Sequence, residues 1–260
     1  MYLRLISVDK YINCKKIPRL LYDNNQQKGN SCMPSSKMIP IHTSRLFIDE
    51  FVAQDYQRLR EIAFHINHNA DVRSAEGYCP FYTFQVDKET PNRDIAIRQK
   101  VSEFLIKAQR EKEQTPRSTY RLAVRLLDGK LIGNVTIDML PFKEGNKTIY
   151  GDLGYFIDPQ YGSQGYATEA VKSVVHQFFK QYNRLDITTH PKNKFSQKLI
   201  ERIGGVQTGY KQSSQYGNHE PRVIFEVHKA DFYKNCALNS HYPDMLAVLI
   251  KYKQRRGKNV

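Results

Sequence analysis

A strand, a glycine-bearing loop and a strongly amphipathic helix follow one another between residues 150 and 178, and this unit constrains the fold more than any other segment. Residues 150–157 read as a strand, and residues 158–165 contain the Pro, Gly and Ser of a turn. A strand that leads through a short loop into such a helix predicts a sheet covered by helices, with a ligand where the strand ends. The helix shows one apolar face at the spacing expected for burial, formed by Ala167, Ala170, Val171, Val174, Val175 and Phe178.

The remaining elements also mix helices and strands. Asp128-Gly129 lies between two strand patterns and indicates a two-residue hairpin, hence an antiparallel pair. Gly204-Gly205 allows a left-handed helix end. With no internal repeat, the order of elements predicts an α/β fold in the mixed α+β sense. The predicted strands cover residues 38–48, 121–126, 132–140, 184–189, 206–211 and 223–228, and the other helices cover residues 53–64, 95–109 and 195–203.

Basic residues are concentrated at the two ends of the chain. The 260 residues carry 40 Lys+Arg against 26 Asp+Glu, a formal net charge of +14, which excludes an acidic disordered protein. Residues 1–40 and 229–260 each hold seven Lys+Arg and two Asp+Glu, so the middle of the chain has a surplus of only four. We therefore predict a basic polar N-terminal extension over residues 1–40, a folded domain over residues 41–228 and a basic C-terminal tail over residues 229–260.

Cysteines and hydrophobic runs narrow the class of protein further. The four cysteines lie far apart, and neither a Cys-x-x-Cys pair nor a Cys/His cluster indicates a metal site. No apolar run approaches the roughly 20 residues that span a bilayer, and the N-terminal segment is too short for a secretory signal. We expect a cytoplasmic protein with reduced cysteines, no bound metal and no membrane partner.

The loop before the helix of residues 167–178 is suited to an anion. The first N–H groups of a helix lack intrahelical acceptors and favour negative charge. The absence of side chains at Gly162 and Gly165 would let a phosphate approach the backbone closely. A plain strand-to-helix turn that uses glycine is the alternative, and neither the P-loop spacing nor the dinucleotide-binding glycine spacing occurs here.

Several motifs around this loop together resemble the GNAT family of N-acetyltransferases. Residues 160–165, Gln-Tyr-Gly-Ser-Gln-Gly, are similar to the acetyl-CoA pyrophosphate loop Gln/Arg-x-x-Gly-x-Gly/Ala of that family. The strand and turn at 153–159, the helix start at 165–170 and the Asn-x-x-Ser segment at 193–196 resemble further family motifs in the same order. Thr-Ser-Arg-Leu at 43–46 is similar to the first strand of the branch that contains the ribosomal-protein alanine acetyltransferases.

The resemblance covers about residues 41–228 and implies a single domain with a mixed, mostly antiparallel central sheet flanked by helices. It also implies that acetyl-CoA is the cosubstrate, that no metal takes part, and that the acetyl group passes directly to a primary amine. Ser163 departs from the usual first glycine of the loop but remains small. The cofactor contacts that the resemblance implies are Tyr155, Phe156, Ile157, Gln160, Gly162, Ser163, Gln164, Gly165, Tyr166, Ala167, Thr168 and Asn193.

Two side chains are candidates for catalysis, and a backbone N–H within residues 155–157 is expected to polarise the thioester carbonyl. Ser196 is the candidate acid for the leaving thiolate, because Ile200 stands where many family members carry a tyrosine. Its alternative is a helix-start hydroxyl that bonds its own backbone. Asp152 stands where related sequences often have a glutamate that deprotonates the amine. Its alternative is an exposed strand carboxylate.

Other functions and partners stay open at this point. A non-catalytic basic nucleic-acid or ribosome-binding protein on this scaffold is one alternative, and a CoA sensor without transfer is another. The acceptor could be a protein N-terminus, a small amine or an aminoglycoside-like polycation. The basic ends could recruit an acidic or nucleic-acid partner, and both monomer and homodimer fit the sequence. We also expect a chain that begins at Met38 to fold and to bind acetyl-CoA.

Overall fold

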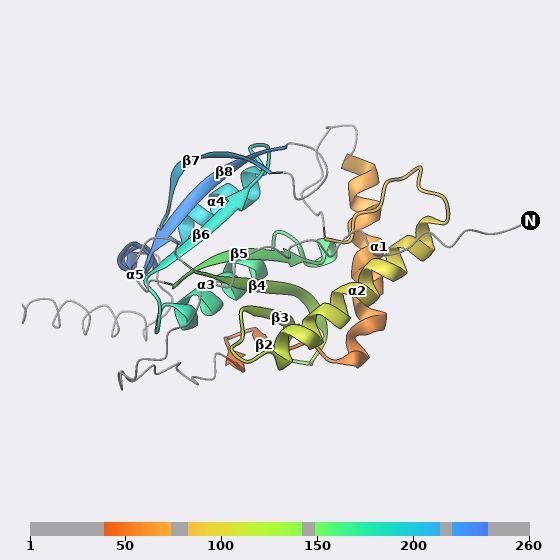
Figure 1. The fold of residues 1–260 in the computed structure, drawn as a ribbon, viewed down its shortest axis with the longest axis horizontal. Coiled ribbons are helices and arrows are strands. Elements are labelled where there is room, and N and C mark those ends of the chain that lie inside the picture. The colour runs from red at the N-terminus through yellow and green to blue at the C-terminus, as the bar shows by residue number, and fades with distance from the viewer. Residues whose placement is uncertain (1–38, 74–82, 142–148, 214–219, 239–260) are drawn as a thin grey trace, which may run out of the picture. The chain divides into compact units, whose positions relative to one another are not determined.

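The computed structural model describes residues 39–73, 83–141, 149–213 and 220–238, and these residues form one eight-stranded sheet (Figure 1). Across the sheet the strands follow the order β1-β2-β3-β4-β5-β6-β8-β7. Every neighbouring pair is antiparallel except β5 and β6, which are parallel, so the predicted mixed, mostly antiparallel sheet is confirmed. The strands are β1 (Ile41–His42), β2 (Leu46–Glu50), β3 (Thr119–Leu126), β4 (Leu131–Pro141), β5 (Ile149–Ile157), β6 (Arg184–Thr189), β7 (Gly205–Ser213) and β8 (Glu220–His228).

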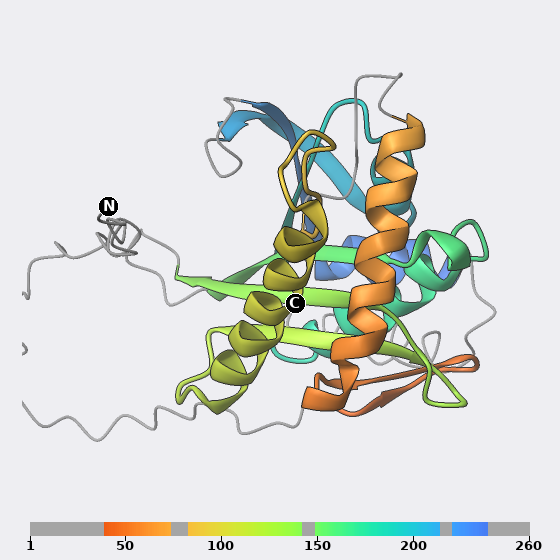
Figure 2. The same cartoon turned by 90° about the vertical axis from the view of Figure 1, so that its right-hand side faces the viewer.

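Helices cover both faces of this sheet. On one face lie α1 (Tyr56–Arg73), which follows the short 3-10 helix η2 (Ala53–Asp55), and α2 (Arg93–Glu113); Figure 2 shows both crossing the strands. On the other face lie α3 (Tyr166–Phe178), α4 (Lys194–Arg202) and α5 (Lys229–Leu238). A second 3-10 helix, η4 (Pro159–Tyr161), connects β5 to the loop before α3. We refer to the first face as the α1/α2 face and to the second as the α3/α4 face.

Two hydrophobic clusters hold the helices to the sheet. The apolar stripe predicted for residues 167–178 is buried as expected, with Ala167 at its edge. Each fully buried Leu, Ile, Val or Phe stabilises the fold by about 1.5–3 kcal/mol. The cluster on the α3/α4 face includes Val171, Val174, Phe178, Leu185, Leu199, Ile200 and Phe225, and the cluster on the α1/α2 face includes Leu59, Ile62, Ile97, Val101, Phe104, Ala123 and Phe156.

Three local details differ from the sequence prediction. Residues 38–48 do not form one strand, because the N–H of Thr43 donates to the carbonyl of Leu46 and turns the chain between β1 and β2. The helix predicted over 53–64 continues to Arg73. The connection between β3 and β4 is longer than the predicted two residues, because residues 127–130 lie between the strands. The N–H of Leu126 donates to the carbonyl of Lys130, and Gly129 takes a φ of 87°.

The C-terminal boundary of the folded domain also differs. Residues 229–238 belong to the predicted basic tail, yet they form α5, and Phe232, Tyr233 and Cys236 are buried against the α3/α4 face. Gly204 makes this contact close: it ends α4 at a φ of 88°, and a Cβ there would lie 2.8 Å from the backbone of Asp231. Residues 239–260 and residues 1–38, with Met38, lie outside the described residues.

Candidate active site

The parallel strands β5 and β6 separate soon after they meet. They pair only at Gly151 with Leu185 and at Asp152 with Asp186, and Figure 1 shows them diverging beyond this point. Bonds between antiparallel strands use alternate residues, and the N–H of Asp158 donates to the carbonyl of Ile132 on β4 at 2.8 Å. The N–H groups of residues 155 and 157 therefore point away from β4, toward the gap between β5 and β6.

A cavity of about 540 Å³ occupies this gap. Tyr155 and Ile187, which face the α3/α4 side, line it together with Gly154 and Thr188, which face the α1/α2 side. The cavity thus reaches both faces of the sheet between the two strands. Eleven of the site residues predicted from the sequence line it: Tyr155, Phe156, Ile157, Gly162, Ser163, Gly165, Tyr166, Ala167, Thr168, Asn193 and Ser196.

Three predicted site residues do not line the cavity. The amide Nε2 of Gln160 lies 2.9 Å from Nε2 of His65 on α1. The side-chain amide of Gln164 bends back toward the backbone carbonyl of Gln160, and the backbone carbonyl of Gln164 accepts a hydrogen bond from Arg45. Asp152 lies in the paired part of β5, before the strands separate. The two glutamines therefore contact neighbouring protein groups, whereas the glycines and Ser163 form the cavity wall.

The loop before α3 leaves free donors at the cavity wall. The first intrahelical bond runs from the N–H of Glu169 to the carbonyl of Gly165, so the N–H groups of residues 166–168 have no intrahelical acceptor. Gly165 takes a φ of 84° and Ser163 a φ of 60°, both in the left-handed region that glycine adopts most easily. An anion such as a phosphate fits this helix N-terminus.

Glu169 ties this loop to the beginning of the domain. Its carboxylate is 7% exposed and accepts hydrogen bonds from the Thr43 and Ser44 hydroxyls and from the backbone and guanidinium of Arg45. The same guanidinium donates to the carbonyl of Gln164 at 3.1 Å and lies over the ring of Tyr166. The Thr-Ser-Arg motif, to which the sequence analysis gave no role, therefore holds the loop in place.

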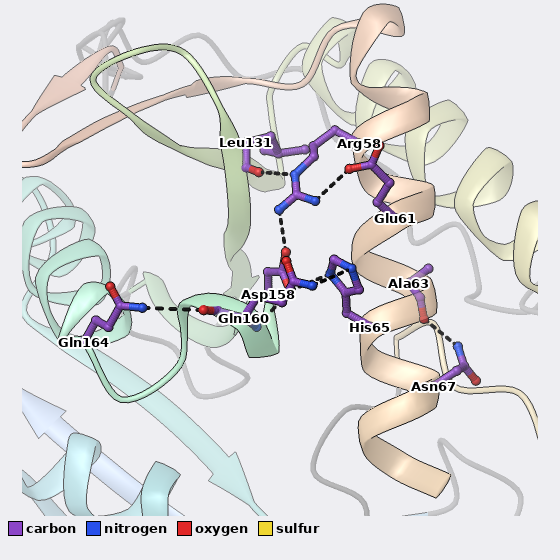
Figure 3. Close-up of polar contacts among 9 residues, drawn as sticks. All are labelled: Arg58, Glu61, Ala63, His65, Asn67, Leu131, Asp158, Gln160 and Gln164. Carbon is purple, nitrogen blue, oxygen red and sulfur yellow. Dashed lines mark hydrogen bonds and ion pairs between the residues drawn. The ribbon is translucent and has the colours of Figure 1, made fainter. Parts of the chain in front are cut away.

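Asp158 anchors the other side of the loop to α1 (Figure 3). Its carboxylate is fully buried and pairs with the guanidinium of Arg58 at 2.5 Å and with Nδ1 of His65 at 2.9 Å. It also accepts the N–H of Gln160 at 3.1 Å, while Nε of Arg58 donates to the carbonyl of Leu131 on β4. The end of β5 is thus fixed between α1 and β4 by a buried ion pair that sequence reasoning missed.

Ser196 also lines the cavity, from the first turn of α4. Asn193 caps this helix by accepting the N–H of Ser196 with its Oδ1 at 3.1 Å. The hydroxyl of Tyr155 donates to Oγ of Ser196 at 3.1 Å, so the Ser196 hydroxyl pairs with a strand and not with its own backbone. Burial raises the pKa of Tyr155 to about 12, which keeps the phenol protonated at neutral pH.

Asp152 is a half-buried carboxylate among other carboxylates. Its register partners are Asp138 on β4 and Asp186 on β6, which lie on the same α1/α2 face. Burial raises the pKa of Asp152 to about 6; Asp138 and Asp186 raise it further and Lys211 lowers it. Gly154, which lines the cavity, is two residues along the strand on the same face, roughly 7 Å away.

The cavity also has wall residues that the sequence analysis did not select. Phe195, on α4 beside Ser196, is 76% exposed although it lines the cavity. Asn69, Arg202 and Arg222 contribute polar groups from α1, α4 and β8. The only sequence signal for Phe195 is an aromatic residue on the polar side of an amphipathic helix.

Within the described part of the chain, no group of three or more His, Cys, Asp and Glu side chains is placed to hold a metal ion. No helix formed by these described residues has the length and apolar character needed to cross a membrane.

Comparison with known proteins gives a domain family. Residues 45–206, more than half of the chain, match the family described as "Acetyltransferase (GNAT) domain". One curated relative, the "Uncharacterized N-acetyltransferase YnaD" of Bacillus subtilis (strain 168), is 31% identical over 61 residues. That match spans 23% of this chain and 36% of the relative, so this chain covers about a third of the relative's length.

Solved structures share the fold at low sequence identity. Mycobacterium smegmatis RimJ in complex with CoA-disulfide is 14% identical, with a TM-score of 0.56, over 75% of this chain and 88% of that one. A putative ribosomal-protein-serine acetyltransferase from Vibrio cholerae is 21% identical, with a TM-score of 0.51, over 72% of this chain and 96% of that one.

Proposed function

Because the chain belongs to the GNAT acetyltransferase family, we propose that it transfers the acetyl group of acetyl-CoA directly to a primary amine. The observation that carries this proposal is the cavity between β5 and β6, whose wall includes both the N-terminus of α3 and Ser196. A thioester with a pyrophosphate needs both features: donors for the phosphates and a polar group near the sulfur.

The phosphates of acetyl-CoA would bind at the N-terminus of α3. Its first-turn N–H groups are available, and the loop is held on both sides, by Glu169 and by Asp158. The pantetheine arm would run along the free edge of β5 at residues 155–157 as a surrogate strand, with Asn193 close to its amides. The solved complex of RimJ with CoA-disulfide, which has the same fold, supports this assignment.

The chemistry requires a neutral amine, a polarised carbonyl and an acceptor for the charge that develops on sulfur. An N–H of β5 that points into the gap would polarise the thioester carbonyl. The amine lone pair forms the C–N bond, the C–S electron pair passes to sulfur, and the nitrogen loses one proton while the thiolate gains one. Ser196 is the candidate donor to the sulfur, because its hydroxyl is at the cavity wall.

Asp152 is proposed as the base that takes the amine proton through a water molecule. Its raised pKa of about 6 keeps it ionised at neutral pH and makes it a better base than an ordinary aspartate. If Asp152 has this role, kcat/KM decreases as the pH drops below about 6. Asp152→Asn should abolish this dependence of kcat/KM on pH.

The acceptor enters from the α1/α2 face in this proposal, because Asp152 and Gly154 lie there. Both protein N-termini and small amines are therefore tested as acceptors. The Vibrio cholerae protein is named as a putative ribosomal-protein-serine acetyltransferase, so the acceptors to be tested include N-terminal peptides of ribosomal proteins. A cytoplasmic location is part of this proposal.

Calorimetric titration of the full chain with acetyl-CoA tests cofactor binding, and ATP serves as the control ligand with phosphates but no pantetheine. We expect binding of acetyl-CoA in the micromolar range and much weaker binding of ATP. A panel of N-terminal peptides and small amines, read by thiol release and mass spectrometry, then tests transfer. Binding without thiol release for any amine supports a CoA sensor. Absence of acetyl-CoA binding together with strongly salt-dependent retention on RNA supports the nucleic-acid alternative.

A further inference from the structure

The contact between Tyr155 and Ser196 joins two elements that are remote in the sequence. Tyr155 lies on β5 and Ser196 on α4, 41 residues later, and their hydroxyl oxygens are 3.1 Å apart. Both residues line the cavity, and only 9% of Ser196 is exposed. The phenol therefore meets the serine at the cavity wall, where a ligand would contact the serine.

The direction of this hydrogen bond decides what Ser196 can offer to a ligand. A hydroxyl carries one hydrogen and can accept through its lone pairs. Tyr155 donates to Oγ of Ser196, so the Ser196 hydrogen is available for another acceptor. The backbone N–H of Ser196 is already bound by Asn193, which fixes the first turn of α4 around this hydroxyl.

Tyr155 keeps its donor role over the whole neutral range. Burial holds its pKa near 12, so the phenol stays protonated where the protein operates. Ser196 also sits in the first turn of its helix, where the helix dipole favours negative charge. Both effects favour a hydroxyl that donates to an anionic or polarisable atom.

We infer that Tyr155 is a positioning residue, which orients the Ser196 hydroxyl as a donor to the sulfur of bound CoA. This inference rests on the proposed function, because it requires a CoA sulfur in the cavity. When the C–S bond breaks, its electron pair stays on sulfur, and the Ser196 O–H stabilises that charge. Tyr155 remains protonated throughout and exchanges no proton with the ligand.

The test measures the pKa of the thiol of bound CoA, which needs no acceptor substrate. Ultraviolet absorbance of the thiolate is followed against pH for the full chain with CoA, with desulfo-CoA as the blank. We expect the bound thiol to be about one pKa unit more acidic than free CoA, since a hydrogen bond to the charged form favours it. Ser196→Ala and Tyr155→Phe should each remove most of this shift, and the double variant should add little to either.

Tyr182→Phe is the matched control, because it removes a tyrosine hydroxyl from a ring that stacks on Phe178 outside the cavity. An unchanged thiol pKa in Tyr155→Phe, with a raised one in Ser196→Ala, would overturn the inference. So would additive effects in the double variant, because Tyr155 would then act on sulfur independently of Ser196.

Two further outcomes are distinguishable. Absence of CoA binding by the unaltered protein rejects the proposed function itself. If Tyr155→Phe does not fold, fluorotyrosine at position 155 provides a more acidic phenol and a stronger donor, and the bound thiol should become still more acidic. An unchanged value in that variant contradicts the orienting role of Tyr155.

Discussion

The guanidinium of Arg45 pairs with the carboxylate of Glu169, and its Nε and Nη2 each lie 2.7 Å from Oε2, although the two residues are 124 positions apart. This pair joins the segment before β2 to the first turn of α3, the helix whose N-terminus faces the cavity. Arg45 is 45% exposed, whereas Glu169 is almost completely buried. Without this contact, water could still hydrate the exposed Arg45 but not the buried Glu169, so its loss costs Glu169 more.

Glu169→Gln should destabilise the domain and weaken cofactor binding. The glutamine keeps the shape but loses the charge that several donors share, which costs about 2 kcal/mol of unfolding free energy. Urea unfolding and acetyl-CoA titration measure the two effects. Glu201→Gln, an exposed carboxylate on α4, is the control and should stay within about 0.5 kcal/mol of the unaltered protein. Equal effects of the two substitutions would contradict the anchoring role of Glu169.

Arg58→Met should be among the most destabilising single changes in the domain. It leaves the fully buried Asp158 without its guanidinium partner, a loss of about 3–5 kcal/mol. Arg98→Met removes an exposed ion pair with Asp94 and should cost no more than about 0.5 kcal/mol. Thermal and urea unfolding of both variants check this. A small effect of Arg58→Met would mean that Asp158 is adequately satisfied by His65 and the backbone.

The left-handed backbone at residue 163 makes a specific prediction about side-chain branching. Ser163 has a φ of 60°, where a β-branched residue is strongly disfavoured. Ser163→Val should therefore lose about 1–2 kcal/mol of unfolding free energy. Ser163→Gly should stay within about 1 kcal/mol, because relief of strain opposes the greater freedom of the unfolded chain. Similar stabilities of the valine and glycine variants would argue against strain at this position.

Asp152 should make stability depend on pH in a predictable direction. Its folded-state pKa of about 6 lies above the ordinary value of 3.8, so the folded state favours the protonated form. The contribution of Asp152 to the free energy of unfolding is therefore fully present below about pH 4, and it is lost as the pH rises through about 6. Relative to Asp152→Asn, the unaltered protein should lose about 1–2 kcal/mol between pH 4.5 and 7.5. Urea unfolding at the two pH values tests this, and a constant difference would contradict the raised pKa.

The exposed ring of Phe195 should matter for ligand binding and not for folding. The ring is 76% exposed and lines the cavity, so a ligand there would cover it. Phe195→Ser should weaken acetyl-CoA binding about five- to tenfold, the equivalent of about 1–1.4 kcal/mol, with little change in unfolding. Tyr210→Ser is the control, since Tyr210 is 68% exposed but is not part of the cavity wall. Equal affinities for both variants would place the ligand away from Phe195.

Local pattern was sufficient for most of the secondary structure. The apolar spacing over residues 167–178 predicted both α3 and its buried face, and the strand predicted over residues 184–189 has the bounds of β6. These features depend on side-chain periodicity within one segment, which the sequence displays directly. α5 was missed because its residues show only weak amphipathic character, and its burial depends on contacts with the α3/α4 face.

The candidate site divides in the same way. The glycine loop and the Asn-x-x-Ser segment are contiguous motifs, and the structure brings both to one cavity. The direction in which Gln160 turns was not predictable, because its partner His65 comes from a distant segment. The contact of Arg45 with the backbone carbonyl of Gln164 was not predictable for the same reason.

The sequence by itself therefore determined most of the segments that become strands and helices, and which loop leaves helix N–H groups free. Only the tertiary structure decided that β5 and β6 separate after two residue pairs, that Tyr155 meets Ser196, and that Asp158 is buried against Arg58. The physical reason is that periodicity and turn chemistry are local, whereas strand register, burial and ion pairing depend on which distant segments pack together.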